Sequence, residues 1–450
     1  HLHAEETDPT TTSTATRAQD LAADVLLKLV LDIPSMQVAD LAVYDRLFPE
    51  KWNLSLLGGS GEVSSRIAVT ADALALDLDL TSDEARLRYA THEASTDLLL
   101  QLRARVDDSD GVTLDLAGTK LRIADAEVTE TGSAAEPVTR SAPWQAALTV
   151  DQGRLSVPVP AAPTDASPVA HAARLIADEG FGALLGSADG RLSTTLNVSH
   201  LDWIAVLLNR PMDLSLAGDA EIDAVIELDD GSPAVGTQLT IPPEQLSLAL
   251  LNHRVDGVGK ATLKIEPGRD GRQVRLDMAF DDGRMRRRDE PEPSIGEVRM
   301  DASLLVRDPI EDATANATLG LKVHSARVHD MRVYNAYLPA HAPLSLLSGE
   351  ASLVSDLRLG PDDAEGELLL TAADLGILVD EQALSGDLRL QVLVRDGSAT
   401  DMRFDITGSS LVLEGLEVVG NTTSVSGADW HARLQLEDTE VLWQKPMHLD

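Results

Sequence analysis

Apolar and polar residues alternate with a period of two along most of the chain. Successive side chains of a β-strand point to opposite faces, so this alternation predicts strands with one apolar and one polar face. The segments ALALDLDL, DLLLQLRARV, DLRLQVLV and ARLQLED follow it. The apolar positions proposed to share a common binding face are Leu74, Leu76, Leu78, Leu80, Leu98, Leu100, Leu102, Leu388, Leu390, Val392, Val394, Leu434 and Leu436.

Asp-Gly pairs separate many of the alternating segments. This dipeptide favours tight hairpin turns, because both of its residues tolerate a left-handed backbone. Strands joined by such turns are antiparallel neighbours, so the chain is predicted to be mainly β and antiparallel. The pairs are Asp110-Gly111, Asp230-Gly231, Asp270-Gly271, Asp282-Gly283 and Asp396-Gly397.

The sequence repeats itself. A shift of 290 residues lays 37–128 over 327–418 without a gap, and both segments contain the motif LSLL followed by a glycine two positions later. We call these segments the N-terminal repeat and the C-terminal repeat. A weaker copy starts near His200 and carries LSL at 214–216. Self-similarity of this kind is typical of proteins built by stacking one structural unit.

Each copy is predicted to begin with a short helix that ends near a proline. The apolar faces of these helices are Leu41, Tyr44 and Phe48 in the first copy, Trp203, Val206 and Leu207 in the second, and Met331, Tyr334 and Leu338 in the third. Helical spacing of Leu21, Val25, Leu26 and Leu29 predicts a further amphipathic helix over 17–33, ending near Pro34. A helical stretch is also expected at 171–176.

These features predict seven successive parts of the chain. They are a polar leader with a short amphipathic helix (1–36), a first β-groove repeat (37–128), a connecting segment (129–196), a second repeat (197–285), connecting strands and a loop (286–326), a third repeat (327–418) and C-terminal strands (419–450).

Charge and cysteine content exclude several classes of function. The net charge is −37, from 74 acidic and 37 basic residues. Such a field repels phosphate backbones, so nucleic acid is not an expected partner. The chain has no cysteine, which excludes disulfides, thiolate nucleophiles and cysteine-bound metals.

No residue pattern indicates catalysis. His92-Glu93 lacks the second histidine of a metalloprotease motif, and the acidic run 107–111 lacks the glycine position and closing glutamate of a calcium loop. The GGSG at 58–61 lacks the spacing of a hydrolase elbow. We therefore expect no enzymatic activity, no metal site and no cofactor.

The apolar face of an antiparallel sheet needs a cover. A second sheet, helices or a ligand could supply it, and the predicted helices are few. One interpretation is a sandwich of the repeats. The other is a groove lined by aliphatic side chains that acyl chains complete. Only 3% of the residues are aromatic, which suits shape-averaged contact with hydrocarbon.

The segments VYDRLFPEKWNLSLLGGSGEV and VYNAYLPAHAPLSLLSGEASL resemble the AsmA-like family of bacterial envelope proteins, the repeating β-groove group that includes TamB-type and YdbH-type members. The resemblance implies a periplasmic protein that carries phospholipid between the inner and outer membranes. It also implies an N-terminal anchor in the inner membrane, expected upstream of His1.

The predicted fold is therefore an elongated, twisted antiparallel sheet curled into an open groove, built from about three repeats with one short helix each. The predicted function is non-enzymatic, bridge-like phospholipid transport. The alternative is an envelope assembly scaffold whose open sheet edge binds an outer-membrane or periplasmic β-rich partner by strand addition.

Overall fold

The computed structural model divides into two compact units. The N-terminal unit comprises His1–Ser199 and Ala220–Leu239, and the C-terminal unit comprises His200–Asp219 and Thr240–Asp450. The structure describes residues 2–4, 29–70, 73–89, 92–107, 113–130, 144–158, 176, 178–207, 214–250, 253–268, 271–287, 292–307, 317–337, 344–379, 382–398, 403–418 and 430–442.

The N-terminal unit is an antiparallel sheet with short helices. Its helices are the 3₁₀ helices η1 (Leu41–Leu47) and η2 (Glu50–Trp52) and the α-helix α3 (Phe181–Gly186). Its strands are β1 (Leu2–Ala4), β2 (Leu29–Val38), β3 (Leu54–Gly58), β4 (Gly61–Val69), β5 (Ala73–Tyr89), β6 (His92–Asp107), β7 (Thr113–Asp115), β8 (Lys120–Glu130), β9 (Trp144–Ser156), β10 (Asp189–Val198), β12 (Ala220–Asp229) and β13 (Ser232–Pro233). The main order of pairing is β2-β4-β5-β6-β8-β9-β10-β12.

The C-terminal unit is built in the same way. Its helices are α4 (Asp202–Leu207) and η4 (Met331–Tyr337). Its strands are β11 (Ser215–Ala217), most of β14 (Gln238–Leu250), β15 (His253–Pro267), β16 (Arg272–Arg287), β17 (Ile295–Arg307), β18 (Ala317–Val328), β19 (Leu344–Leu359), β20 (Ala364–Val379), β21 (Gln382–Val394), β24 (Ser410–Val418) and β25 (Trp430–Gln435), and a small separate sheet of β22 (Asp396–Ser398), β23 (Arg403–Asp405) and β26 (Glu440–Leu442). From β15 to β21 each strand pairs with the next, and β24 and β25 follow.

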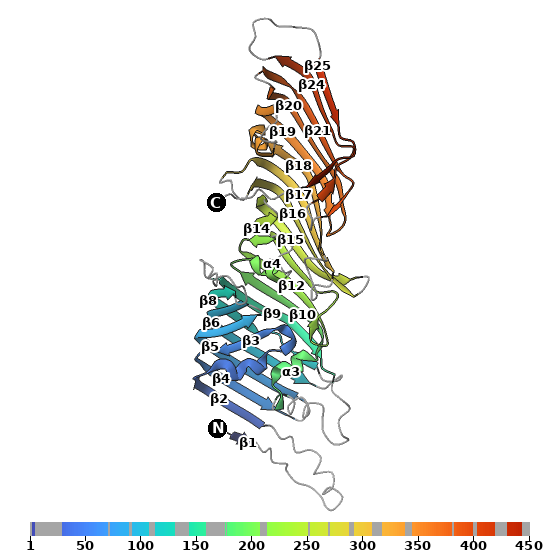
Figure 1. The fold of residues 1–450 in the computed structure, drawn as a ribbon. Coiled ribbons are helices and arrows are strands. Elements are labelled where there is room, and N and C mark those ends of the chain that lie inside the picture. The colour runs from blue at the N-terminus through green and yellow to red at the C-terminus, as the bar shows by residue number, and fades with distance from the viewer. Residues whose placement is uncertain are drawn as a thin grey trace, which may run out of the picture. The chain divides into compact units, whose positions relative to one another are not determined.

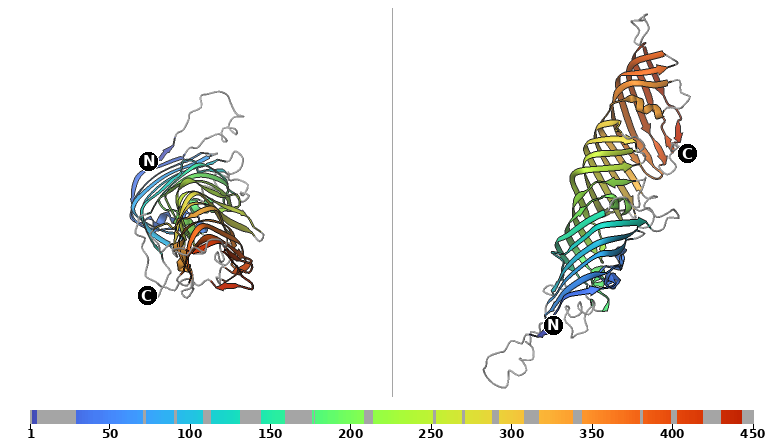
Figure 2. Two further views of the ribbon diagram at one scale, coloured as in Figure 1. Left: turned by 90° about the horizontal axis from the view of Figure 1, so that it is seen from above. Right: turned by 90° about the vertical axis from the view of Figure 1, so that its left-hand side faces the viewer.

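The period-two pattern explains the two faces of each sheet. In the N-terminal unit Leu78 pairs with Leu102 on one face, while Arg103 reaches Asp79 on the other face, with 2.7 Å between Nη2 and Oδ1. Within each unit, successive strands lie side by side and the sheet curves (Figure 1 and Figure 2). The prediction of a mainly β chain, with antiparallel strands in a curled sheet and a short helix in each repeat, is confirmed.

Two local predictions need correction. Residues 29–33 are not the end of a helix but belong to β2, which passes through Pro34 at a register shift where a strand tolerates proline. Residues 17–28 lie outside the described part of the chain. The connecting segment 129–196 contains strand β9, most of strand β10 and the helix α3. Residues 171–175 also lie outside the described part.

The Asp-Gly pairs differ in structure. Asp230-Gly231 forms the predicted turn, between β12 and β13. Asp282-Gly283 does not form a turn. Strand β16 continues through this pair with a β-bulge and is paired with a strand on each side. Asp396-Gly397 starts strand β22. The pairs at 110–111 and 270–271 lie wholly or partly outside the described residues.

The repeat is visible in matched hydrogen bonds. In the N-terminal repeat the backbone N–H of Leu56 donates to Oδ1 of Asp45 at 2.7 Å. At the same positions of the C-terminal repeat, the N–H of Leu346 donates to Oδ1 of Asn335, also at 2.7 Å. Each bond ties the short helix to the strand that follows it, so the LSL motif and the helix belong to one structural unit.

In each repeat a Thr or Ser that directly follows a glycine in a turn, here called the glycine turn, makes two hydrogen bonds to the main chain of one strand residue. We call this pair of bonds the hydroxyl clamp. Oγ1 of Thr119 accepts from the N–H of Arg103 at 3.1 Å and donates to its carbonyl at 3.0 Å. Ser409 makes the same pair of bonds to Leu393, and Thr237 makes it to a residue of β12. The side chain thus replaces the backbone partner that the strand loses where its neighbour turns.

Replacing Thr119 with valine is expected to destabilise the N-terminal unit by about 1–3 kcal/mol. The partly buried main-chain N–H and carbonyl of Arg103 would both lose their hydrogen-bond partner. Thr119→Ser keeps the hydroxyl and serves as the matched control, since serine occupies this position at 409. Chemical denaturation measures the difference. Equal stability of the two variants would show that the hydroxyl is not needed.

Candidate functional site

The apolar face of the N-terminal unit is continuous across the strands. Aliphatic side chains line up in cross-strand register from β4 to β12, so each row runs perpendicular to the strands. One row consists of Val63, Leu80, Leu100, Leu121, Leu148, Leu196 and Ile222. Such a row needs a cover that is itself apolar.

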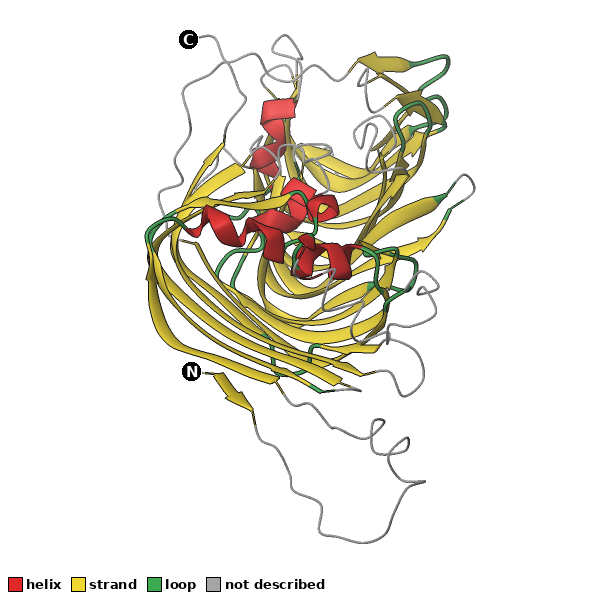
Figure 3. Ribbon diagram, turned by 90° about the horizontal axis from the view of Figure 1, so that it is seen from below, coloured by secondary structure: helices red, strands yellow, loops and turns green. Residues whose placement is uncertain are grey.

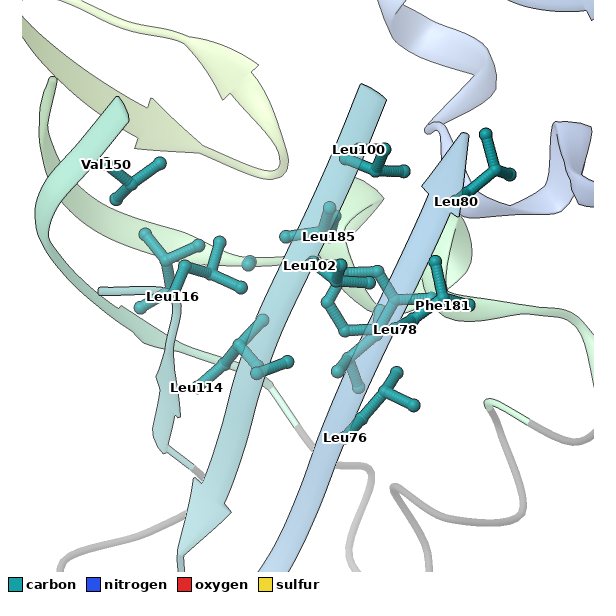
Figure 4. Close-up of a cluster of buried hydrophobic side chains, with 14 of the residues drawn as sticks. Leu76, Leu78, Leu80, Leu100, Leu102, Leu114, Leu116, Val150, Phe181 and Leu185 are labelled. Atoms are coloured by element: carbon teal, nitrogen blue, oxygen red, sulfur yellow. The ribbon is translucent and has the colours of Figure 1, made fainter. Parts of the chain in front are cut away.

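The chain covers this face with its own helices. The helices lie inside the curve of the strands (Figure 3), and α3 contributes Phe181, Leu184 and Leu185 to the same buried cluster as the leucines of β5 and β6 (Figure 4). None of the predicted binding residues here is more than 9% exposed. They are Leu74, Leu76, Leu78, Leu80, Leu98, Leu100 and Leu102.

Close backbone contacts fix this cover in place. A Cβ on Gly182 would overlap the carbonyl of Phe48, and one on Gly231 would overlap the backbone of Gly186 at the end of α3. Nζ of Lys51 donates to the carbonyl of Gly186 at 3.0 Å and pairs with Asp230 Oδ2 at 2.6 Å. The helix therefore lies wedged between the two 3₁₀ helices and the β12–β13 turn.

The apolar face of the C-terminal unit becomes uncovered toward β25. One cross-strand row consists of Leu353, Leu370, Leu390, Leu411 and Leu434. The first two are buried, the next two are partly exposed, and Leu434 is 57% exposed. This gradient places an open apolar surface on β21, β24 and β25.

The remaining predicted binding residues of this unit follow the same trend. Leu388 is buried, Val392 and Val394 are partly exposed on β21, and Leu436 is partly exposed just beyond β25. We define the open apolar surface as Leu390, Val392, Val394, Leu411, Leu413 and Leu434. In cross-strand register these side chains share one face.

Two equivalent positions of the two repeats differ in exposure, whereas Leu121 and its counterpart Leu411 are both partly exposed. Leu100 is 7% exposed, whereas its counterpart Leu390 is partly exposed. Leu114 is fully buried, but its counterpart Phe404 is partly exposed. In the N-terminal unit α3 follows β9, whereas among the described residues β25 is followed only by β26.

Helix α3 is the element that sequence reasoning missed. Its segment FGALLG is too short for a helical period to stand out, and two of its six residues are glycines, which disfavour helix. The available signal was the rarity of phenylalanine: Phe181 is one of four in the chain. A large aromatic side chain in a segment that otherwise reads as a linker indicates a docking point.

The polar face carries a separate depression of about 430 Å³ over β15 to β19. Its charged lining is mixed in sign, with Lys260 and Lys322 beside Asp277, Asp301 and Asp356. Burial raises the pKa of Asp277, and Lys322 pairs with Asp356 at 3.0 Å. These charges lie on the opposite face from the open apolar surface and are not part of it.

Few titratable groups near the apolar faces are perturbed. Burial raises the pKa of Tyr44 on η1, and hydrogen bonds from Thr407 lower the pKa of Asp405 beside the glycine turn. Within the described ranges, His, Asp and Glu side chains form no group of three that could hold a metal ion. The helices described there are all too short or too polar to cross a bilayer.

Comparison with known proteins does not assign the chain to a family. No family model matches the chain, and neither a curated protein nor a solved structure matches it.

Proposed function

We propose that the chain is a non-enzymatic carrier that binds phospholipids by their acyl chains and moves them through the periplasm between the inner and outer membranes. The proposal that the chain binds lipid rests on the open apolar surface of β21, β24 and β25, where Leu434 is 57% exposed. The resemblance of the repeat segments to AsmA-like proteins supports the location and the route.

The chemistry of this surface suits a hydrocarbon ligand. Its side chains are aliphatic, and the backbone groups of its inner strands are paired in the ladder. Burying each CH₂ group of a ligand against it contributes about 0.8 kcal/mol. Because these contacts have no direction, an acyl chain is held at many registers along the rows. Tight retention and sliding are therefore compatible.

Phospholipid is expected to co-purify with the protein expressed in a Gram-negative host. Native mass spectrometry of the full chain should show adducts of phospholipid mass, and solvent extraction should recover them. A matched preparation of a soluble acidic protein without an open apolar face controls for carry-over. Lipid-free protein from a membrane-containing lysate would contradict the proposal.

One observation favours the scaffold alternative. Among the described strands β25 pairs only with β24, which makes it the edge strand of the described sheet. Edges of this kind recruit β-rich partners. Crosslinking through residues of β25 to a specific envelope protein, with no lipid bound, would favour this function over lipid carriage.

A further inference from the structure

We propose that the depression on the polar face of β15 to β19 binds a small, freely dissolved zwitterion, a molecule with one ammonium group and one acidic group. The ammonium group lies against the carboxylate of Asp277, and the acidic group lies against Nζ of Lys260. The whole lining belongs to the C-terminal unit. A lipid held on the apolar face of the sheet cannot place its headgroup here, because the depression opens on the opposite face.

Most of the charges around the depression already have partners. Nζ of Lys322 lies 3.0 Å from Oδ2 of Asp356, and Nε2 of His324 lies 2.7 Å from Oδ2 of Asp301. The space between these pairs is about 430 Å³, within the range of about 300–1,000 Å³ that small-molecule sites occupy. A ligand of this size therefore meets only the charges that are still unmatched.

The unmatched charges are one cation and one anion. Lys260 and Asp277 form no ion pair with each other or with another side chain of the described residues, and Arg275 near Asp277 is paired with Glu266 at 3.1 Å. Asp277 is half-buried, and this burial raises the pKa of its carboxyl against the opposing charge of Arg275. An ammonium group beside Asp277 would supply the counter-charge that it lacks. An acidic group would do the same for Lys260, so a zwitterion satisfies both ends at once.

The floor of the depression consists of small residues, with Gly320 between Ser303 of β17 and Arg358 of β19. Gly320 is not among the glycines with a positive φ, so its backbone does not demand glycine. A Cβ at this position would lie 2.6 Å from Oγ of Ser303. Glycine inside a strand weakens it and often marks a place where a ligand approaches closely. Here it keeps the depression open.

The first repeat shows that the fold does not require glycine at this position. The 290-residue shift lays β2 over β18 and β4 over β19 in the same register, because Val30 pairs with Ala68 and Gly320 pairs with Arg358. The counterpart of Gly320 is therefore Val30. Valine is favoured in strands, so Gly320 gives up strand stability and leaves an open space in its place.

Binding of ω-amino acids to the full chain tests the assignment. The series runs from glycine to 6-aminohexanoate, so that the distance between the two charges varies, and saturation-transfer difference NMR of the methylene protons gives each Kd. We expect one member to bind about fivefold or more tightly than butylamine and butyrate, which carry only one of the two charges. If every member binds as weakly as these two, the proposal is wrong.

Three variants locate the bound zwitterion. Lys260→Ala and Asp277→Asn should each weaken its binding about fivefold, since each removes one of the two counter-charges. Gly320→Val places the side chain of the first repeat in the depression and should weaken binding more than tenfold. Arg299→Ala is the matched control, because it removes an exposed cation of β17 that lies outside the lining, and it should leave the Kd unchanged. Circular dichroism checks that each variant is folded.

The outcomes also distinguish a free zwitterion from a lipid headgroup. An unchanged Kd in Lys260→Ala overturns the assignment, and this exposed position gives the answer even if Gly320→Val does not fold. The lipid-to-protein ratio after extraction should be the same in Lys260→Ala as in the natural sequence. A loss of bound phospholipid in this variant would show that the depression holds a headgroup, and would overturn the proposal of a freely dissolved ligand.

Discussion

Replacing Leu390 with aspartate is expected to remove most of the phospholipid bound to the protein while the sheet stays folded. Leu390 is partly exposed, so the new carboxylate is hydrated in the free protein. An acyl chain that covered it would have to strip that water away, and dehydrating a charge costs several kcal/mol. Affinity should therefore fall by about a hundredfold or more. The lipid-to-protein ratio after extraction measures the loss.

The equivalent position of the N-terminal repeat supplies a matched control. Leu100 is buried in the cluster that α3 covers, and an unpaired charge there is expected to cost about 3–5 kcal/mol of stability. Leu100→Asp should thus lower the midpoint of unfolding strongly, and Leu390→Asp only slightly. Retention of lipid by a folded Leu390→Asp protein would argue against binding at the open apolar surface.

Truncating Phe181 to alanine is expected to destabilise the N-terminal unit by about 3–5 kcal/mol. The ring is 2% exposed, and its loss leaves a cavity between α3 and the leucines of β5. Urea denaturation, followed by tryptophan fluorescence to which Trp52 on the adjoining η2 contributes, measures the effect. Trp52 is suited to this because its Nε1 donates to the carbonyl of Gly231 at 2.9 Å, next to the end of α3.

Phe404 provides the comparison for this variant. It is partly exposed at the position equivalent to Leu114, so Phe404→Ala should cost less than half as much. If both substitutions had the same small effect, α3 would not be a packed cover of the N-terminal face. A large effect of Phe404→Ala alone would show that the C-terminal face is closed instead.

Much of the fold follows from the sequence because the alternation of side chains fixes which strand face is apolar. A slip of one residue would turn Leu78 and Leu102 outward, so the pattern also fixes their register. The 290-residue repeat predicts equivalent local geometry, and the bonds of Asp45 and Asn335 show it. The misplaced helix had a local cause: Leu29 continues the helical spacing of Val25 and Leu26, and it also alternates with Leu31 and Ile33.

The state of the candidate site could not be predicted in the same way. Leu100 and Leu390 have the same residue type in similar segments, yet one is buried and the other is partly exposed. Leu100 belongs to a buried cluster that includes α3, which lies some 80 positions along the chain and is held by the close approach of Gly182 and Gly231 to other backbones. A contact between segments so distant leaves no trace in the pattern of either strand.

The polar groups that shape each repeat find their partners close by in the sequence. The clamp of Thr119 spans 16 residues and the bond of Asp45 spans 11. A duplicated stretch of the gene would therefore bring along every side chain that its own turns require. Lengthening such a protein by whole modules demands no compensating change elsewhere, so natural selection could adjust its reach in steps of one repeat.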